Sequence, residues 1–284
     1  MNLYPIESGN FKLDGGAMFG VVPKSLWQRT NPADGNNMID MAARCLLIEN
    51  GDRLTLIDTG MGNKQSEKFF GYYFMDHRFD LDSSLKRYGF SRDDITDVFL
   101  THLHFDHCGG SIVRDGDGLV PAFAKAEFHT NKAHWDWAIN PNKRERASFL
   151  TENILPIKES GQLNYIKQST SFEHSTGLDF DILFVDGHTE KQMIPHINHD
   201  GKTFVFVADL LPTAGHLPIP YVMGYDTRPL ITLDEKEKFL EKAARENYYL
   251  ILEHDPYNEI ITVEQTDRGV RLKDSLTFNE LFNY

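Results

Sequence analysis

The chain has 284 residues, of which 40% are hydrophobic and 25% charged, as in ordinary soluble globular proteins of one large domain or two small ones. Its net charge of −13 argues against nucleic acid as a partner, because nucleic-acid binding depends on Lys and Arg side chains that neutralise phosphates. With two cysteines, no signal-peptide pattern and no apolar run of membrane-spanning length, we expect a cytoplasmic protein without disulfides or a membrane partner.

The first half of the chain is predicted to mix strands and helices. Asn50-Gly51-Asp52 is typical of a hairpin turn between two apolar runs. We expect strands over residues 43–49, 53–58, 95–100, 121–128 and 161–171, and helices over 64–73, 81–88 and 143–155. The segment around 129–160, which is rich in aromatic residues at its start, is interpreted as an insertion.

The second half is more regular. A second hairpin is predicted around the turn at 198–201, and a Pro-rich loop runs from Pro212 to Pro229. Thr232-Leu-Asp-Glu235 has the pattern of a capping box that opens a helix over 234–246. We expect strands over residues 180–185, 192–197, 202–208 and 248–253.

The segment Thr101–Gly110, directly after strand 95–100, contains His102, His104, Asp106 and His107. In an extended chain His102 and His104 point to the same side, so they can bind one metal ion together. The chain has to turn at Phe105 for Asp106 and His107 to face inward as well. This pattern predicts a metal site.

Three further strands each end in a potential metal ligand. His188 follows strand 180–185, Asp209 follows strand 202–208, and His254 follows strand 248–253. Strands of layered α/β sheets bring their ends to one edge, so these residues can converge with Thr101–Gly110. Seven ligands suit two ions, whereas a structural zinc site needs four and favours cysteine.

Together these residues resemble the metallo-β-lactamase fold hydrolases. The matching segments are His102-x-His104-x-Asp106-His107, Gly187-His188-Thr189, Asp209, His254 and the early turn Asp58-Thr59-Gly60. The resemblance covers nearly the whole chain. It implies an α/β fold, an αββα four-layer sandwich of two mixed sheets with helices outside, in a single domain over residues 1–284.

The resemblance also implies two Zn²⁺ ions per chain. His102, His104 and His188 would hold the first ion, Asp106, His107 and His254 the second, and Asp209 would bridge both. His104 stands where the flavodiiron branch of the superfamily has Glu, which favours zinc and hydrolysis. Iron stays an alternative, because dioxygenases of the superfamily share the histidine motif.

Within the superfamily, residues 15–20 and 209–216 resemble the quorum-quenching N-acyl homoserine lactone lactonases. This resemblance implies opening of a lactone ring by a hydroxide that the two ions share, with Asp106 passing the proton to the leaving group. Some of these lactonases have a substrate-binding Tyr where this chain has Pro212. Its role would fall to His216, to Tyr221 or to the metal alone.

Several alternatives stay open at this stage. His216 fits either a donor to the substrate oxyanion or a packed loop histidine, and Met18 and Phe19 fit either an acyl-chain wall or the core. The same metal site could serve a phosphotriesterase or arylesterase. A non-catalytic metal-bound binding module is the alternative from another class, although a complete ligand set argues against it. A homodimer is possible, with a small molecule as substrate.

Overall fold

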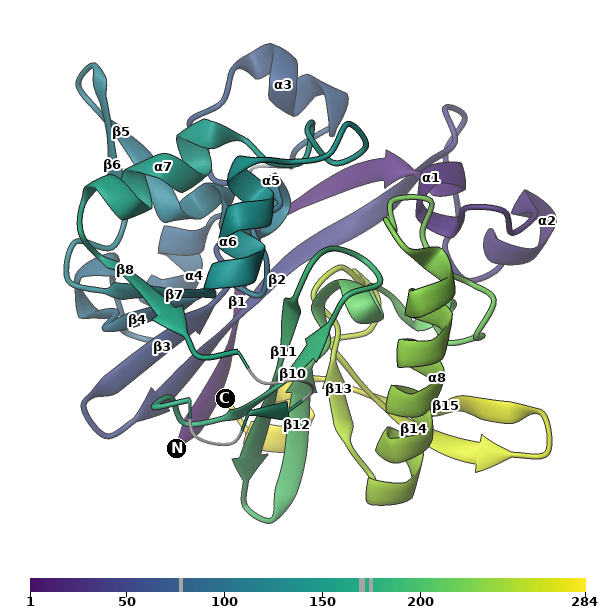
Figure 1. Ribbon diagram of the computed structural model, residues 1–284. Coiled ribbons are helices and arrows are strands. Elements are labelled where there is room, and N and C mark those ends of the chain that lie inside the picture. Colours follow the sequence, from purple (N-terminus) through teal and green to yellow (C-terminus); the bar gives the residue numbers. More distant parts are fainter. Residues whose placement is uncertain (77–78, 169–171, 174–175) are drawn as a thin grey trace. The chain divides into compact units, whose positions relative to one another are not determined.

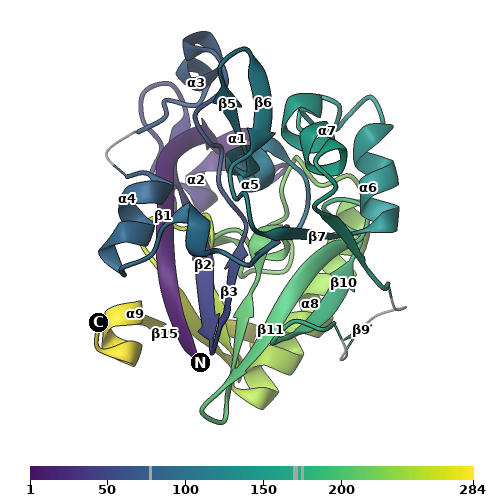
Figure 2. The same ribbon diagram turned by 90° about the vertical axis from the view of Figure 1, so that its left-hand side faces the viewer.

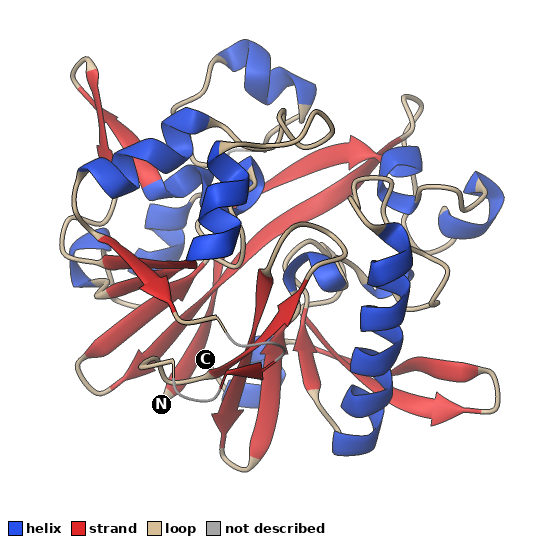
Figure 3. Cartoon of the chain, viewed as in Figure 1, coloured by secondary structure: helices blue, strands red, loops and turns tan. Residues whose placement is uncertain are grey.

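The structure is a computed structural model that describes residues 1–76, 79–168, 172–173 and 176–284 (Figure 1). Helices and strands both occur throughout the chain (Figure 3), which divides into two compact units. The first unit comprises Met1–Phe11 and Ala43–Ser169, and the second comprises Lys12–Ala42 and Thr170–Tyr284. Among the described residues, no helix is long and apolar enough to cross a bilayer.

The first unit is built on a six-stranded mixed sheet with the order β1-β2-β3-β4-β7-β8. β2 and β3 are antiparallel, whereas β3, β4, β7 and β8 run parallel to one another. Figure 2 shows β1, β2 and β3 side by side. The strands are β1 (Asn2–Asp14), β2 (Met38–Asn50), β3 (Arg53–Ile57), β4 (Asp97–Phe99), β7 (Glu127–Asn131) and β8 (Leu163–Ile166), with a separate hairpin of β5 (Ile112–Asp115) and β6 (Gly118–Pro121).

Helices of the first unit share one hydrophobic core with its sheet. Leu56 of β3, Val98 of β4 and Phe128 of β7 are buried in one cluster with Trp135 of α6. The helices are α3 (Glu67–Tyr72), α4 (Leu81–Arg87), α5 (Phe105–Cys108), α6 (Lys132–Ile139) and α7 (Thr151–Glu159), with 3₁₀ turns at Arg92–Asp94 and Gly109–Ser111. This core fixes the strand end from which the histidine-rich segment leaves the sheet.

The second unit is built on a seven-stranded mixed sheet with the order β15-β14-β13-β12-β11-β10-β9. β12 and β13 are parallel, and the other neighbouring strands are antiparallel. The strands are β9 (Phe172–Glu173), β10 (Asp181–Val185), β11 (Gln192–His199), β12 (Lys202–Phe206), β13 (Tyr249–Ile251), β14 (Ile260–Thr266) and β15 (Gly269–Leu276). The helices are α1 (Gly15–Phe19), α2 (Lys24–Trp27), α8 (Pro229–Glu246) and α9 (Phe278–Phe282), with 3₁₀ turns at Ala208–Leu210 and Ala214–His216.

Both predicted hairpins are confirmed. β2 and β3 pair with Asn50 opposite Arg53, and Gly51 at their turn has a φ of 60°. β11 and β12 pair with His199 opposite Lys202. In both turns a glycine adopts the left-handed backbone conformation that other residues rarely adopt.

One predicted helix and one predicted strand differ from the structure. Residues 143–155 were expected to be one helix, but α6 ends at Ile139 and α7 begins at Thr151. The Asn142 side chain accepts hydrogen bonds from the backbone N–H groups of Arg144 and Glu145, which stabilises a turn there instead of a helix. Of the strand expected over 161–171, β8 covers Leu163–Ile166, and residues 169–171 lie outside the described residues.

The predicted capping box at Thr232 is also wrong. α8 begins five residues earlier than expected, at Pro229, so Glu235 lies inside the helix. Its carboxylate accepts the backbone N–H groups of Asp186 and Gly187, at 2.8 and 2.9 Å. Glu235 therefore binds the turn at Asp186–Gly187 instead of capping its own helix. The single-domain organisation over residues 1–284, with an insertion at 129–160, stays a prediction.

Close glycine packing holds the histidine-rich segment in the first unit. A Cβ atom at Gly109 would overlap the backbone carbonyl of Met61. We therefore expect Gly109→Ala to lower the free energy of unfolding by about 2 kcal/mol, because the extra methyl group has to push two backbone segments apart. Chemical denaturation with urea measures this change.

Gly71 in α3 provides the matched control, because a Cβ there would meet no atom within 4 Å. Gly71→Ala should leave stability unchanged or raise it slightly. Equal stability of the Gly109→Ala and Gly71→Ala variants would contradict the close packing.

Candidate metal centre

In the first unit, Asp58 fixes the start of the histidine-rich segment. Asp58 follows β3, and its carboxylate accepts the backbone N–H of Thr101 at 2.8 Å and the Thr101 hydroxyl at 2.6 Å. The Asp58 side chain is fully buried. Two hydrogen bonds to one buried carboxylate therefore set the position from which the chain continues into His102.

The same carboxylate orients His107, and Thr101 orients His102. Nδ1 of His107 lies 3.1 Å from Asp58 Oδ2. Nδ1 of His102 lies 3.1 Å from Thr101 Oγ1, whose own proton is donated to Asp58. In both rings Nδ1 is therefore the donor, and Nε2 carries the lone pair that can bind a metal ion.

His104 is oriented the other way round. Its Nε2 lies 3.4 Å from Oε1 of Glu145, so Nδ1 carries the lone pair. This Nδ1 is 3.1 Å from Nε2 of His102. Both nitrogens carry lone pairs, which repel each other at this distance. A cation that contacts both nitrogens would make the arrangement favourable.

Residues 129–160 contact the histidine-rich segment of the first unit. Glu145 is buried and accepts hydrogen bonds from Trp137 Nε1 at 2.7 Å and from Asn142 Nδ2 at 2.6 Å. The backbone N–H of Leu103 donates to Nε2 of His134 at 2.8 Å. Side chains of the region interpreted as an insertion therefore position the histidine-rich segment.

The second unit brings His188, Asp209 and His254 together. Oδ2 of Asp209 lies 3.0 Å from Nε2 of His188, and Oδ1 lies 3.3 Å from Nε2 of His254. Nδ1 of His254 donates to the carbonyl oxygen of Ala42 at 2.9 Å. Since a carbonyl only accepts, Nε2 of His254 carries the lone pair and faces a carboxylate oxygen, which favours a cation between them.

His188 lies between two carboxylates. Its Nδ1 is 3.0 Å from Oδ1 of the buried Asp226, on the side away from Asp209. Burial lowers the pKa of His188, but Asp209 and Asp226 outweigh it and raise the pKa to about 10. The two carboxylates therefore favour positive charge at this ring, which a bound divalent cation also supplies.

α8 holds the turn that carries His188. Besides the two hydrogen bonds that Glu235 accepts, the helix approaches so closely that a Cβ at Gly187 would overlap the backbone of Thr232. The backbone N–H of Thr227 donates to the carbonyl of His188 at 3.1 Å. These contacts fix the direction of the His188 side chain.

The donor set fits a borderline metal ion such as Zn²⁺. All five histidines direct one ring nitrogen to an oxygen atom and leave the other with its lone pair, which is the usual arrangement of metal-binding histidines. Cys108 does not belong to the donor set. Its burial raises the pKa of the thiol to about 12, and Sγ donates to the carbonyl of Leu103 at 3.3 Å.

His216, one of the two predicted catalytic residues, is held by protein atoms on both ring nitrogens. Nε2 is 2.9 Å from the carbonyl oxygen of Met18, and Nδ1 is 2.8 Å from Thr213 Oγ1. The carbonyl requires Nε2–H, so Nδ1 accepts from the Thr213 hydroxyl. Burial lowers the pKa of the imidazole to about 3. Of the two interpretations left open, these contacts favour the packed loop histidine.

Met18 and Phe19 are buried, and the Phe19 ring stacks between two other rings of the second unit. Its centroid lies 4.2 Å from that of His216 and 5.3 Å from that of Trp27. Tyr221 meets Phe19 edge-on at 6.3 Å. These contacts favour core packing for Met18 and Phe19, whereas substrate binding by Tyr221 stays a prediction.

Lys236 of α8 forms hydrogen bonds with the Pro-rich loop. Its buried Nζ donates to the carbonyl oxygens of His216, Pro218 and Tyr221, at 2.9, 3.1 and 2.7 Å. Burial lowers the pKa of Lys236 to about 7. Three carbonyl acceptors require all three N–H groups, so this geometry corresponds to the charged amine.

Four residues orient the proposed ligands, and the sequence did not predict this role for them. Asp58 could have been found, because it ends a strand and begins the Asp-Thr-Gly turn. Glu145 and Asp226 carry no local signal, since each acts on a residue about 40 positions away in the chain. Glu235 stood in a local pattern that predicted a capping box instead.

Three comparisons with known proteins show what this chain is similar to. The sequence model of the metallo-beta-lactamase superfamily matches residues 39–254. The N-acyl homoserine lactonase AiiA of Bacillus thuringiensis subsp. kurstaki is 22% identical over 231 residues, which cover 77% of this chain and 83% of that protein. A probable metal-dependent hydrolase from Staphylococcus aureus, known as a crystal structure, is 27% identical with a TM-score of 0.86, covering 97% of this chain and 98% of that one. AidC, a dizinc quorum-quenching lactonase in complex with a product, is 23% identical with a TM-score of 0.77, covering 98% of this chain and 95% of that one.

The contact between Asp226 and His188 generates a testable prediction. Asp226→Ala removes the acceptor for Nδ1 of His188, so the ring loses its orientation and its basicity. We expect the affinity for Zn²⁺ to fall by ~10- to 100-fold. Competition with a chromophoric chelator measures it.

Asp226→Asn, which retains an oxygen acceptor, should lose less affinity than Asp226→Ala. Asp234→Ala, on the exposed side of α8, should lose none. Zn²⁺ affinity that is the same in all three variants would show that Asp226 does not orient a metal ligand.

Proposed function

Because this chain belongs to the metallo-beta-lactamase superfamily and is a metal-dependent hydrolase, we propose that it uses two Zn²⁺ ions to open the lactone ring of N-acyl homoserine lactones. The observation that carries the proposal is the orientation of the five histidines, whose outward nitrogens all meet oxygen atoms within their own unit. The lactonases among the similar proteins support the choice of substrate.

In this proposal both clusters contribute to both ions. His102, His104 and His188 would hold the first ion, Asp106, His107 and His254 would hold the second, and Asp209 would contribute to both. Each cluster alone has too few donors for two ions. The two oxygens of Asp209 face different histidines, His188 at 3.0 Å and His254 at 3.3 Å, which supports a carboxylate shared by the two ligand groups.

When bound, two such ions lower the pKa of water and polarise a carbonyl group. Asp106 then serves as proton carrier between water and the leaving ring oxygen. Its side chain is 14% exposed, whereas the neighbouring His107 is fully buried, so Asp106 can reach a bound molecule. Oδ2 of Asp106 is 3.9 Å from Nε2 of His107, which keeps the carboxylate beside the ligand ring.

An aromatic cluster beside Asp106 supports an acyl-chain substrate. The rings of Phe69 and Tyr73 lie 5.3 and 4.9 Å from that of Phe105, the residue before Asp106. Burial and the charge of Asp106 raise the pKa of Tyr73, so its phenol stays protonated at neutral pH. We assign the apolar wall for the acyl chain to these three residues, in place of Met18 and Phe19.

In this proposal neither Pro212 nor His216 donates a hydrogen bond to the carbonyl oxygen of the substrate. In this account polarisation by the metal is sufficient, or Tyr221 supplies the hydrogen bond. A cytoplasmic location and a homodimer remain predictions from the sequence.

The test compares wild type with Asp106→Asn on a panel of N-acyl homoserine lactones, with acid release followed by a pH indicator. We expect wild type to cleave them and to stop when a chelator removes the metal. Asp106→Asn should lower kcat by ~100-fold or more, because an amide cannot carry the proton, while most of the bound metal is retained.

Asp136→Asn, at an exposed carboxylate paired with Lys132, is the matched control and should retain full activity. Absence of lactone cleavage together with strong cleavage of a phosphotriester or arylester would overturn the lactonase proposal. Absence of any chelator-sensitive hydrolysis would instead favour a binding module.

A further inference from the structure

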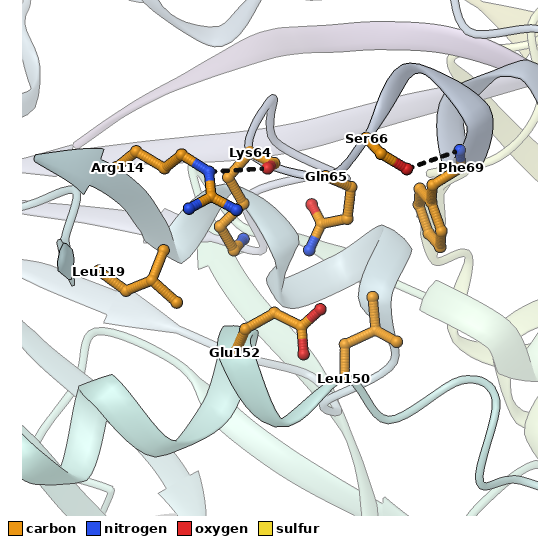
Figure 4. Close-up of a pocket in the computed structure, with 8 residues that line it drawn as sticks. All are labelled: Lys64, Gln65, Ser66, Phe69, Arg114, Leu119, Leu150 and Glu152. Atoms are coloured by element: carbon orange, nitrogen blue, oxygen red, sulfur yellow. Dashed lines mark hydrogen bonds between the residues drawn. The ribbon is translucent and has the colours of Figure 1, made fainter. Parts of the chain in front are cut away.

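A pocket whose lining contains none of the histidines lies in the first unit (Figure 4). Its volume is about 210 Å³, and three segments form it: the loop that leads into α3, the β5–β6 hairpin and the start of α7. The lining residues are Lys64, Gln65, Ser66, Phe69, Arg114, Leu119, Leu150 and Glu152.

Lys64 places a buried positive charge at this pocket. Its Nζ donates to the carbonyl oxygen of Gly109, and in the described part of the chain its two other N–H groups have no acceptor. Burial lowers the pKa of Lys64 to about 8, so the amine stays mostly protonated at neutral pH. A buried amine with unused donors favours an anionic ligand.

Arg114 adds a second cation with unused donors. Its Nε donates to the backbone carbonyl of Lys64 at 3.2 Å. Neither of its terminal nitrogens has a carboxylate partner among the described residues. Figure 4 shows the guanidinium directed into the same space as the side chains of Gln65 and Glu152. A guanidinium with two open N–H groups matches the geometry of a carboxylate.

Gln65 contributes an unpaired acceptor. Its Nε2 donates to Asn153 Oδ1 at 3.1 Å, but its buried Oε1 has no hydrogen-bond partner within the described residues. A buried carbonyl oxygen without a donor is costly. A hydroxyl or amide N–H on a ligand would satisfy it.

The remaining lining residues limit the ligand. Phe69, Leu119 and Leu150 provide an apolar wall, and Glu152 adds one negative charge to the two positive ones. The pocket therefore has a net charge of about +1 in a chain whose net charge is −13. A monoanion with an apolar part fits this lining better than a dianion such as phosphate, which Glu152 would repel.

We infer that this pocket is a second ligand site, which binds a small carboxylate that carries a hydroxyl or amide donor and a short apolar chain. The carboxylate pairs with Arg114 and Lys64, the donor meets Gln65 Oε1, and the chain lies on Leu119 and Leu150. This inference stands on the pocket alone and does not depend on the lactonase proposal.

The test is isothermal titration of the metal-loaded full chain with 2-hydroxyhexanoate, hexanoate and inorganic phosphate. We expect 2-hydroxyhexanoate to bind ~5-fold more tightly than hexanoate, because only the hydroxy acid donates to Gln65, and phosphate to bind most weakly. Arg114→Gln should weaken 2-hydroxyhexanoate binding by ~10-fold or more, with Arg114→Lys in between.

Glu152→Gln should change the affinity in the opposite direction to Arg114→Gln. Removing the negative charge of Glu152 should tighten binding of 2-hydroxyhexanoate by ~3-fold. Arg268→Gln, at an exposed position of the second unit, is the control and should change nothing. Binding that is equal in wild type and Arg114→Gln would place the acid elsewhere, for instance on the metal ions, and would overturn the inference. Tighter binding of phosphate than of either acid would overturn the carboxylate assignment.

Discussion

The structure depends on one repeated interaction, the contact between the outward nitrogen of each of these five buried histidines and an oxygen atom. Thr101, Glu145 and Asp58 provide this oxygen in the first unit, and Asp226 and Ala42 provide it in the second. Each contact favours one tautomer and one rotation of its ring. The inward nitrogens therefore present lone pairs, which only a proton or a metal ion can use in a buried site.

Buried carboxylates are the main cost of this arrangement, and the surrounding fold compensates for it. Asp58 accepts two hydrogen bonds from Thr101, and Glu145 accepts two from Trp137 and Asn142. A buried carboxylate is stable only when its oxygens are paired in this way. The hydrogen bonds to these carboxylates thus help to hold the proposed metal ligands in place.

Much of this protein was predictable because its signals are local. The hairpins follow from Asn-Gly and Asp-Gly turns, and the proposed ligands are polar residues placed directly after apolar strands. The family resemblance and the α/β fold with two mixed sheets are confirmed. Glu145 and Asp226 could not be predicted, because their partners are distant in sequence. Glu235 gave a misleading local pattern, since its carboxylate binds a neighbouring loop instead of its own helix.

The central claim is that these histidines hold two zinc ions through nitrogen and oxygen donors alone. X-ray absorption spectroscopy of the zinc-loaded protein tests it most directly. The account predicts nitrogen and oxygen ligands at about 2.0–2.2 Å and a second zinc ion at roughly 3.5–4 Å. A sulfur ligand at about 2.3 Å, or no zinc neighbour in a fully loaded sample, would contradict it.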